Sequence, residues 1–135
     1  MNVIKERIKR HEGYRAKPYY CSGGKLTIGY GRNIEELGIS KAEAEFLLES
    51  DIKRCHQECL KSFWWYGQMD PMRQGVLVEL CFNLGVSKLK KFKKMLLSCE
   101  LKNYALAADE MLSSLWARQV GGRAQKLAEI MRKGA

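Results

Sequence analysis

The chain has 135 residues, 46% of them hydrophobic and 29% charged, which suits one globular domain and is too short for two. Its two prolines and its lack of any low-complexity tract exclude a disordered or linker-rich protein. The net charge of +9 points to a polyanionic partner, either a nucleic acid or an anionic envelope polymer, or else to a merely solvated surface.

The N-terminal segment predicts a short amphipathic helix over residues 2–12. Ile4 and Ile8 recur at helical spacing, and Glu12, four residues further on, places a carboxylate at the end of the apolar stripe. We expect this carboxylate to face the core or the wall of a cleft rather than open solvent. Gly13 is expected to end the helix.

The next segment predicts a β-hairpin with a glycine-rich turn. A two-residue loop at 23–24 would put Cys21 and Thr27 on opposite faces, whereas a three-residue loop at 23–25 would pair them on one face. Gly24 is available for the left-handed position that such a loop needs. We favour the three-residue loop because it directs a thiol and a hydroxyl toward the same place.

A long helix is predicted after the hairpin. Residues 32–39 predict a short polar connection, and Ser40 with Glu43 three residues later forms the pattern of a capping box. Apolar residues then keep helical periodicity, so we expect a helix over about 40–62 with a length of about 30 Å.

Two groups of residues, one on this helix and one after it, resemble a metal site and a sugar-binding site, but we expect both to be structural. Cys55 and Cys59 share a helical face, but His56 lies about 100° away and no second pair completes a tetrahedral metal site. We therefore expect buried thiols there. The Phe-Trp-Trp-Tyr run at 63–66 is expected to cover a hydrophobic core, with a sugar-binding platform as the alternative.

The remainder of the chain predicts a bundle of amphipathic helices. Asp70 followed by Pro71 marks a helix start, Gly85 ends that helix, and a last helix is expected over residues 122–132. Glu79 lies within the otherwise apolar central helix. We expect it to be partly exposed or ion-paired, with a second catalytic carboxylate as the alternative.

The spacing of three polar residues near the N-terminus resembles a known active-site signature. Glu12, eight residues, Cys21, five residues and Thr27, followed by Ile-Gly-Tyr-Gly, is similar to the signature of the phage-type lysozymes, the endolysins of the T-even phage type in glycoside hydrolase family 24. The resemblance continues in order through Phe-Asn-Leu-Gly at 82–85 and through residues 116–123, so that it covers essentially the whole chain. The family normally has Asp where this chain has Cys21, although members with Cys are known.

The resemblance implies an α+β, lysozyme-like fold in a single domain over residues 1–135. A small N-terminal lobe with the β-hairpin would cover about 13–40, and a long connecting helix about 40–62. A larger helical C-terminal lobe would cover about 68–135, with helix 2–12 packed on it, and would face the small lobe across a cleft.

The resemblance also implies an activity, the hydrolysis of the β-1,4 bond between N-acetylmuramic acid and N-acetylglucosamine in bacterial peptidoglycan for host cell lysis. Glu12, with a pKa raised by partial burial, would protonate the leaving oxygen. Cys21 would act as base, nucleophile or electrostatic stabiliser in place of the aspartate, and Thr27 would hold the attacking water. Both inverting and retaining outcomes are open.

Four residues of the helical region are candidates for substrate binding, namely Phe82, Asn83, Gln119 and Arg123. Asn83, at a helix end beside Phe82, can hydrogen-bond a sugar acetamide or hydroxyl. Arg123 opens the last helix at the unfavourable end of its dipole and therefore needs an anionic partner. The resemblance names Glu12 as that partner; an exposed surface arginine is the alternative.

The expected partners are peptidoglycan and anionic cell-envelope polymers. The densest basic cluster is Lys88, Lys90, Lys91, Lys93 and Lys94, but no zinc-finger, RNA-recognition or helix-turn-helix pattern supports a nucleic-acid partner. We expect no cofactor and no metal, and a monomer. A peptidoglycan-binding relative without activity and a basic helical nucleic-acid binder are the rival functions.

The expected location follows from the cysteines and from the N-terminus. Five cysteines without a paired framework indicate free thiols in a reducing compartment. The N-terminus has no secretory signal, and no stretch is long and apolar enough to span a membrane. We therefore expect synthesis in the host cytoplasm and action on the cell wall in the periplasm after release through a pore protein.

Overall fold

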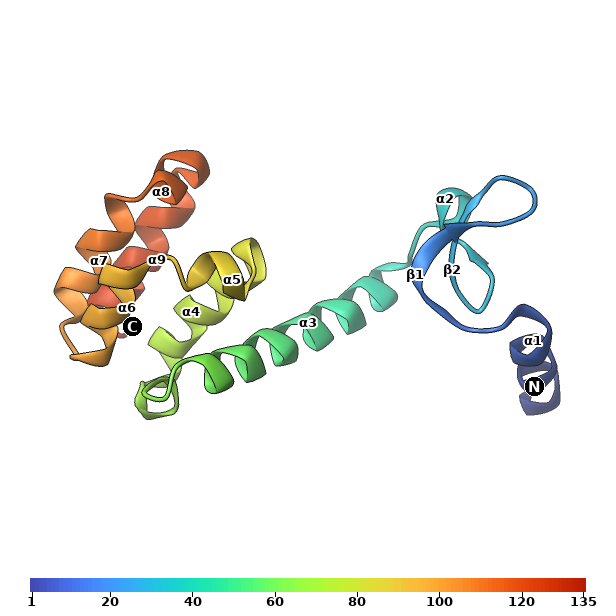
Figure 1. The fold of residues 1–135 in the computed structure, drawn as a ribbon, viewed down its shortest axis with the longest axis horizontal. Helices are drawn as coiled ribbons and strands as arrows, with labels where there is room; N and C mark the ends of the chain where they lie inside the picture. Colours follow the sequence, from blue (N-terminus) through green and yellow to red (C-terminus); the bar gives the residue numbers. More distant parts are fainter. The chain divides into compact units, whose positions relative to one another are not determined.

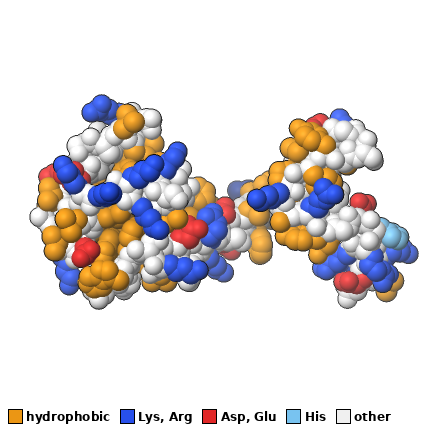
Figure 2. Space-filling model, in the orientation of Figure 1, with side chains coloured by type: hydrophobic (Ala, Val, Ile, Leu, Met, Phe, Trp, Pro, Cys, Tyr) orange, Lys and Arg blue, Asp and Glu red, His pale blue; other side chains and the backbone are white.

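Figure 1 shows the computed structural model, which describes residues 1–135. The chain is mostly helical and carries one small antiparallel sheet, which confirms the predicted α+β class. It divides into two compact units, residues 1–47 and residues 48–135. Lys and Arg side chains are distributed over the visible surface of both units (Figure 2). No helix combines the length and the apolar character that a membrane-spanning segment needs.

The first unit begins with the predicted helix and hairpin. Helix α1, Asn2–Glu12, ends at Gly13, whose φ of 72° is in the left-handed region that glycine favours. The sheet has the order β1-β2-β3, formed by β1 (Arg15–Tyr20), β2 (Leu26–Gly29) and β3 (Arg32–Asn33). α1 buries none of its residues, so its apolar stripe is not part of a core within this unit. The packing of this helix on the helical lobe stays a prediction.

The predicted polar connection at 32–39 is wrong, because this segment contains β3 and the one-turn helix α2 (Ile34–Leu37). Arg32 pairs with Ile28 of β2, and the side chain of Asn33 accepts a hydrogen bond from the N–H of Glu36 at 3.1 Å. A capping asparagine therefore starts a helix of a single turn.

Helix α3, Lys41–Ser62, confirms the predicted long helix. Its capping box is present in both directions: the N–H of Glu43 donates to Ser40 Oγ at 3.1 Å, and the N–H of Ser40 donates to Glu43 Oε1 at 2.8 Å. The division between the two units falls within this helix, after Leu47. In its second part Cys55 and Cys59 are fully buried, which confirms the expectation of core thiols.

The second unit is the predicted helical bundle. Its helices are η1 (Tyr66–Gln68), α4 (Pro71–Leu84), α5 (Val86–Leu89), α6 (Lys93–Glu100), α7 (Tyr104–Leu112), α8 (Leu115–Val120) and α9 (Gly122–Lys133). The predicted cap of α4 is present, because Asp70 Oδ2 accepts a hydrogen bond from the N–H of Arg73 at 3.0 Å. The helix ends at Gly85 as expected, with φ of 84°.

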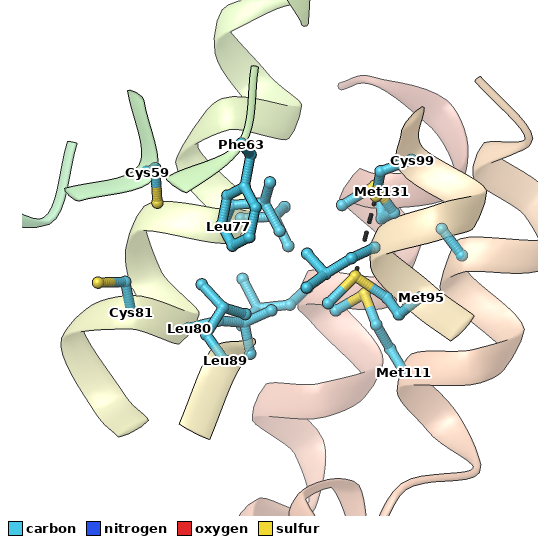
Figure 3. Packing of buried hydrophobic residues seen from close by; sticks show 14 of the residues in the cluster. Cys59, Phe63, Leu77, Leu80, Cys81, Leu89, Met95, Cys99, Met111 and Met131 are labelled. Carbon is cyan, nitrogen blue, oxygen red and sulfur yellow. Dashed lines mark hydrogen bonds between the residues drawn. The ribbon is translucent and has the colours of Figure 1, made fainter. Parts of the chain in front are cut away.

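The core of this unit is rich in sulfur as well as in aliphatic carbon (Figure 3). Cys99 Sγ lies 3.8 Å from Met95 Sδ and 3.9 Å from Met131 Sδ, so α6 and α9 meet at one sulfur cluster. Leu77 and Leu80 extend from α4 into the same core and are fully buried. The short helices of this bundle leave irregular spaces between them, and methionine and cysteine side chains fill such spaces.

The aromatic run at 63–66 mainly covers this core, as expected. Phe63, Trp65 and Tyr66 are buried, and the rings of Phe63 and Trp65 stack with 5.2 Å between their centroids. Trp64 differs from its neighbours, because 70% of it is exposed. The hydroxyl of Tyr66 forms a hydrogen bond with His56 Nδ1 at 2.7 Å. His56 is the histidine next to Cys55 that was considered above as a metal ligand.

Candidate active site

The hairpin has neither of the two registers considered from the sequence. Tyr19 pairs with Thr27, and the N–H of Cys21 donates to the carbonyl of Lys25 at 3.0 Å, so the loop consists of residues 22–24. The loop has three residues, as favoured, but it starts one residue earlier. The predicted pairing of Cys21 with Thr27 is therefore wrong.

The reason lies in the last position of the loop. A three-residue hairpin loop places its third residue in the left-handed region. In the observed loop that residue is Gly24, with φ of 76°, whereas the predicted loop would have put Lys25 there. Glycine adopts this conformation without the steric cost that a lysine would carry.

The observed register keeps Cys21 and Thr27 on one face of the hairpin. It differs from the favoured register by two residues, and because side chains alternate with a period of two, a slip of two preserves the face. Cys21 and Thr27 are consequently diagonal neighbours rather than a direct pair. The expected placement of a thiol beside a hydroxyl is therefore present, although Thr27 pairs with Tyr19 and not with Cys21.

The surroundings of Cys21 favour its thiolate. The backbone N–H of Lys25, then that of Gly23 and then the side chain of Thr27 hydrogen-bond the sulfur and lower the pKa of the Cys21 thiol below its ordinary value. The side chain is half-buried, so a substrate can reach it. A partly exposed thiol with stabilised charge is the environment of a reactive cysteine.

Thr27 is the one buried polar residue of the sheet, with 3% of its surface exposed. Its hydroxyl donates to the carbonyl of Lys25 at 2.8 Å and also lies within hydrogen-bonding reach of Cys21. A hydroxyl has a single proton to donate. Thr27 can therefore donate to Lys25 and accept from a thiol or a water molecule, or rotate and donate to the Cys21 thiolate.

Glu12 is the last residue of α1 and lies against the turn that follows β2. A Cβ atom on Gly31 would lie only 2.6 Å from Glu12 Oε2, so the carboxylate lies directly against this glycine, whose φ of 74° is in the left-handed region. Lys9, on the same helix, lies over the ring of Tyr30, with 5.4 Å from Nζ to the ring centroid. The left-handed backbone at Gly31 explains the second glycine of the Ile-Gly-Tyr-Gly sequence.

Within the first unit Glu12 faces no core. The residue is exposed and forms no ion pair with another residue of that unit, and α1 has no buried residue. The wall of a cleft stays a prediction. One unit thus carries Glu12, Cys21 and Thr27, with Glu12 held at the turn after β2 and the other two on the hairpin.

The second unit carries the four predicted substrate-binding residues. Arg123 Nε donates to Glu79 Oε2 at 2.9 Å, so Arg123 has an anionic partner within its own unit. Glu12 lies in the other unit, and its predicted pairing with Arg123 stays a prediction. The physical reason is that α4 and α9 pack together and place the two side chains opposite each other. The expectation that Glu79 is partly exposed and ion-paired is confirmed.

Asn83 lies one helical turn after Glu79 on α4 and also has a protein partner. Its Oδ1 accepts a hydrogen bond from Trp116 Nε1 at 2.8 Å, so this oxygen satisfies a buried indole. Its amide NH₂ stays free for a ligand. Phe82 and Gln119 are exposed, on α4 and α8 respectively.

The sequence reasoning missed three contacts of these residues. They are the approach of Glu12 to Gly31, the hydrogen bond from Trp116 to Asn83 and the pairing of Arg123 with Glu79. The spacing of Glu79 and Asn83, four residues apart on one helix face, is the signal that could have linked the last two.

Comparison with known proteins places the chain in a family. The family model described as phage lysozyme matches residues 9–134. A probable T4-type lysozyme 2 of Dictyostelium discoideum is 28% identical, over 99% of this chain and 96% of its own length. An endolysin of Acyrthosiphon pisum secondary endosymbiont phage 1 is 27% identical, over 93% of this chain and 86% of its own length.

A further relative is a much longer protein. The pre-baseplate central spike protein Gp5 of Enterobacteria phage T4 is 27% identical over 96% of this chain, but the match covers 27% of that protein. The same fold unit therefore occurs both alone and inside a larger chain. The family match extends from the end of α1 to the end of α9 and includes the hairpin with Glu12, Cys21 and Thr27. The chain belongs to the phage lysozyme family and has the lysozyme-like α+β fold and peptidoglycan-hydrolysing activity of that family.

Proposed function

We propose that this protein is an endolysin that hydrolyses the β-1,4 bond between N-acetylmuramic acid and N-acetylglucosamine, using Glu12, Cys21 and Thr27. The observation that carries the proposal is the Cys21 thiol, whose charged form accepts hydrogen bonds on the same hairpin face as Thr27. A stabilised anion is what the oxocarbenium-like transition state of glycoside hydrolysis requires beside it.

Glu12 is the general acid in this proposal. It gives its proton to the glycosidic oxygen as the bond from that oxygen to the anomeric carbon breaks. The position of Glu12 at the end of a helix, with its carboxylate beside Gly31 and accessible to solvent, supports this role, because a substrate can reach the carboxyl group.

Cys21 completes the reaction by one of two routes. As a nucleophile, the thiolate forms a bond to the anomeric carbon while the glycosidic bond breaks; water then displaces sulfur, giving its proton to Glu12 and regenerating the thiolate. As a base, the thiolate takes a proton from a water molecule held by Thr27, and that water attacks directly, while the thiolate charge stabilises the cationic sugar. The first route retains the anomeric configuration and the second inverts it.

Phe82, Asn83, Gln119 and Arg123 are proposed to hold the glycan chain. Asn83 has a free amide NH₂ and Arg123 donates to Glu79 through Nε alone, which leaves its terminal nitrogens for sugar hydroxyl or carboxylate oxygens. Phe82 is 45% exposed and offers an apolar face to a sugar ring. The net charge of +9 supports attraction to anionic envelope polymers.

The proposed setting is phage release. The protein would be made in the host cytoplasm, act as a monomer and reach the cell wall in the periplasm after a pore protein opens the inner membrane. The phage relative that is named an endolysin, and that this chain matches over most of its length, supports this setting.

The test is a product analysis on purified peptidoglycan sacculi. After borohydride reduction, the proposal predicts new muramitol ends, released in proportion to enzyme and time. A lyase would give anhydromuramic ends and an amidase would give free amines without new reducing sugars. Binding to sacculi without soluble products would instead support the non-catalytic relative, and binding of oligonucleotides alone would support the nucleic-acid binder.

A further inference from the structure

The basic cluster of the second unit has no ion-pair partners. Its five lysines are all exposed, and none of them forms an ion pair; they are Lys88, Lys90, Lys91, Lys93 and Lys94. Helix α6, which two of them open, has no acidic residue in its first turn. Like charges held this close repel one another, so an anion that binds among them relieves that repulsion.

Four of these lysines border a groove of about 630 Å³; they are Lys88, Lys91, Lys93 and Lys94. The floor of the groove is apolar and includes Phe92 and Trp116, whose rings contact edge to face with 6.4 Å between centroids. Leu115 stands at the rim with 66% of its surface exposed. One carboxylate, that of Glu110, also lines the groove, against four lysines. The groove therefore combines a hydrocarbon surface with a predominantly cationic border.

A second hollow of about 320 Å³ adjoins the first, and Lys93 borders both. Trp64 and Leu97 line it beside Lys90, and they are 70% and 55% exposed. On the face of this unit that Figure 2 shows, Lys and Arg side chains lie among hydrophobic ones. Exposed tryptophan and leucine next to lysine is the composition of protein surfaces that bind at a membrane interface.

The groove is poorly equipped for sugars, because its uncharged polar side chains are already engaged. Ser113 Oγ donates to the carbonyl of Glu110 at 3.1 Å, and Ser114 Oγ donates to that of Met111 at 2.7 Å. Ser114 Oγ also accepts from the N–H of Ala117. The two hydroxyl protons are therefore used within the protein, which leaves Ser113 Oγ and the Glu110 carboxylate as acceptors and the lysines as the free donors. Lysines bind phosphate as point charges.

The larger groove is also poorly equipped for nucleic acid. Base stacking on single strands uses several aromatic faces in succession, but Trp116 is 4% exposed and Phe92 is half-buried, which leaves Trp64 of the second hollow as the one open ring on the lysine face. A phosphate attached to hydrocarbon matches the groove better than a phosphate attached to a base or a sugar.

We propose that this lysine face, formed by Lys88–Lys94 with the two hollows beside it, docks the protein on bilayers that contain anionic phospholipid. The lysines contact the phosphates, while Leu115 and Trp64 enter the boundary between headgroups and acyl chains. This function is separate from glycan hydrolysis, and it would hold the enzyme beside the membranes that enclose the wall.

The test is a sedimentation assay with vesicles of phosphatidylcholine mixed with phosphatidylglycerol, compared with vesicles of phosphatidylcholine alone. Wild-type protein should bind the anionic vesicles, less so as salt rises, and should not bind the neutral ones. The variant Lys88→Gln/Lys91→Gln/Lys94→Gln should bind roughly a hundredfold more weakly, because each basic side chain near an anionic leaflet contributes about fivefold.

The matched control is Lys41→Gln/Lys53→Gln/Lys126→Gln, which removes the same charge from exposed positions outside the lysine face. It should bind within a few-fold of wild type, and both variants should release muramitol from sacculi at the wild-type rate. Equal losses in the two variants would mean that only net charge matters and would overturn the proposal. Failure of wild type to bind anionic vesicles would do the same, whatever its hydrolytic activity.

A fluorescence measurement tests the apolar contact separately. Trp64 is the exposed tryptophan, since Trp65 and Trp116 are buried. Acyl chains brominated near the headgroup should quench the wild-type emission on anionic vesicles, and Trp64→Phe should lose most of that quenching. If lipid-free phosphorylated glycan from deacylated lipopolysaccharide displaces the protein from vesicles at matched phosphate concentration, the occupant is a glycan and the proposal is wrong.

Discussion

Cys21 and Thr27 are diagonal neighbours on one face of the β1–β2 hairpin, although the residue that pairs directly with Thr27 is Tyr19. The hydroxyl of Thr27 and two backbone N–H groups of the turn stabilise the Cys21 thiolate. The N–H groups of a turn that ends in a left-handed glycine thus stabilise a negative charge on sulfur, at the position where the family usually has the carboxylate of an aspartate.

Two substitutions test the role of Cys21, because they are expected to have opposite effects on activity. Cys21→Asp should keep substantial activity, because a carboxylate is also an anionic base. Cys21→Ser should lose most of it, since a hydroxyl of similar shape has neither a low pKa nor comparable nucleophilicity. The measurement is the rate of muramitol formation on sacculi. A serine variant as active as wild type would remove the thiol from the chemistry.

Cys21 should also show its lowered pKa directly. Because its pKa is lowered, its thiolate persists to lower pH than that of an ordinary thiol, and reactivity is lost as pH falls through that pKa. The rate of iodoacetamide alkylation against pH should therefore have its midpoint below that of free cysteine. Burial raises the pKa of Cys59 and of Cys99 to about 12, so neither competes. A midpoint equal to that of free cysteine would contradict the proposed environment.

Thiol blocking gives an independent control for the same residue. Methyl methanethiosulfonate should inactivate wild type and leave Cys21→Asp active, since the other four cysteines are buried. Equal inactivation of both proteins would place the sensitive thiol elsewhere.

The pair of Arg123 and Glu79 should contribute little to stability. The two side chains are 38% and 42% exposed, and exposed ion pairs typically contribute about 0.2–1 kcal/mol. Arg123→Gln and Glu79→Gln should each change the free energy of unfolding in urea by less than about 1 kcal/mol. If Arg123 binds the glycan, Arg123→Gln should lower kcat/KM by about tenfold or more, and Glu79→Gln should lower it less. Equal losses in the two variants would reduce Arg123 to a structural role.

Asp70 should make the stability of α4 depend on pH. Burial disfavours its charge, but hydrogen bonds from the N–H and side chain of Arg73 outweigh that effect and lower the pKa of Asp70. A lowered pKa in the folded state stabilises the fold above the unfolded pKa of about 3.9, and this contribution is lost as pH falls through the folded pKa.

The measurement for Asp70 is thermal unfolding of wild type and two variants against pH. Asp70→Ala should cost about 1 kcal/mol at neutral pH, the usual value for a lost helix cap. Asp70→Asn keeps a capping oxygen without the charge, so its deficit relative to wild type should shrink as the pH falls below about 4. A deficit that does not change with pH would show that the charge of Asp70 contributes nothing.

Local patterns in the sequence were enough to predict most of the elements. The reciprocal cap of Ser40 and Glu43, the start of α4 at Asp70 and the ends of α1 and α4 at glycines all rest on interactions within a few residues. The helix α2 was missed because a single turn has no periodicity, and only the Asn33 cap marks it.

The hairpin was predicted only in part. The sequence indicated that it exists, that Gly24 is left-handed, and that Cys21 and Thr27 share a face. The start of the loop depends on which residue occupies the third loop position, and the prediction did not consider this. The pairing of Arg123 with Glu79 could not be predicted for a different reason. Glu79 is 44 residues away in the chain, and only the packing of α4 and α9 brings the two together.

Glu12→Gln tests the account most directly, by the rate at which the purified variant forms muramitol ends on sacculi. The amide keeps the shape of the side chain beside Gly31 but cannot donate the proton, and general acid–base catalysis contributes roughly 10²–10⁴-fold. We predict a loss of at least that size with an unchanged thermal unfolding midpoint. A variant that forms muramitol at close to the wild-type rate would contradict the assignment of Glu12 as the acid, and with it the proposed mechanism.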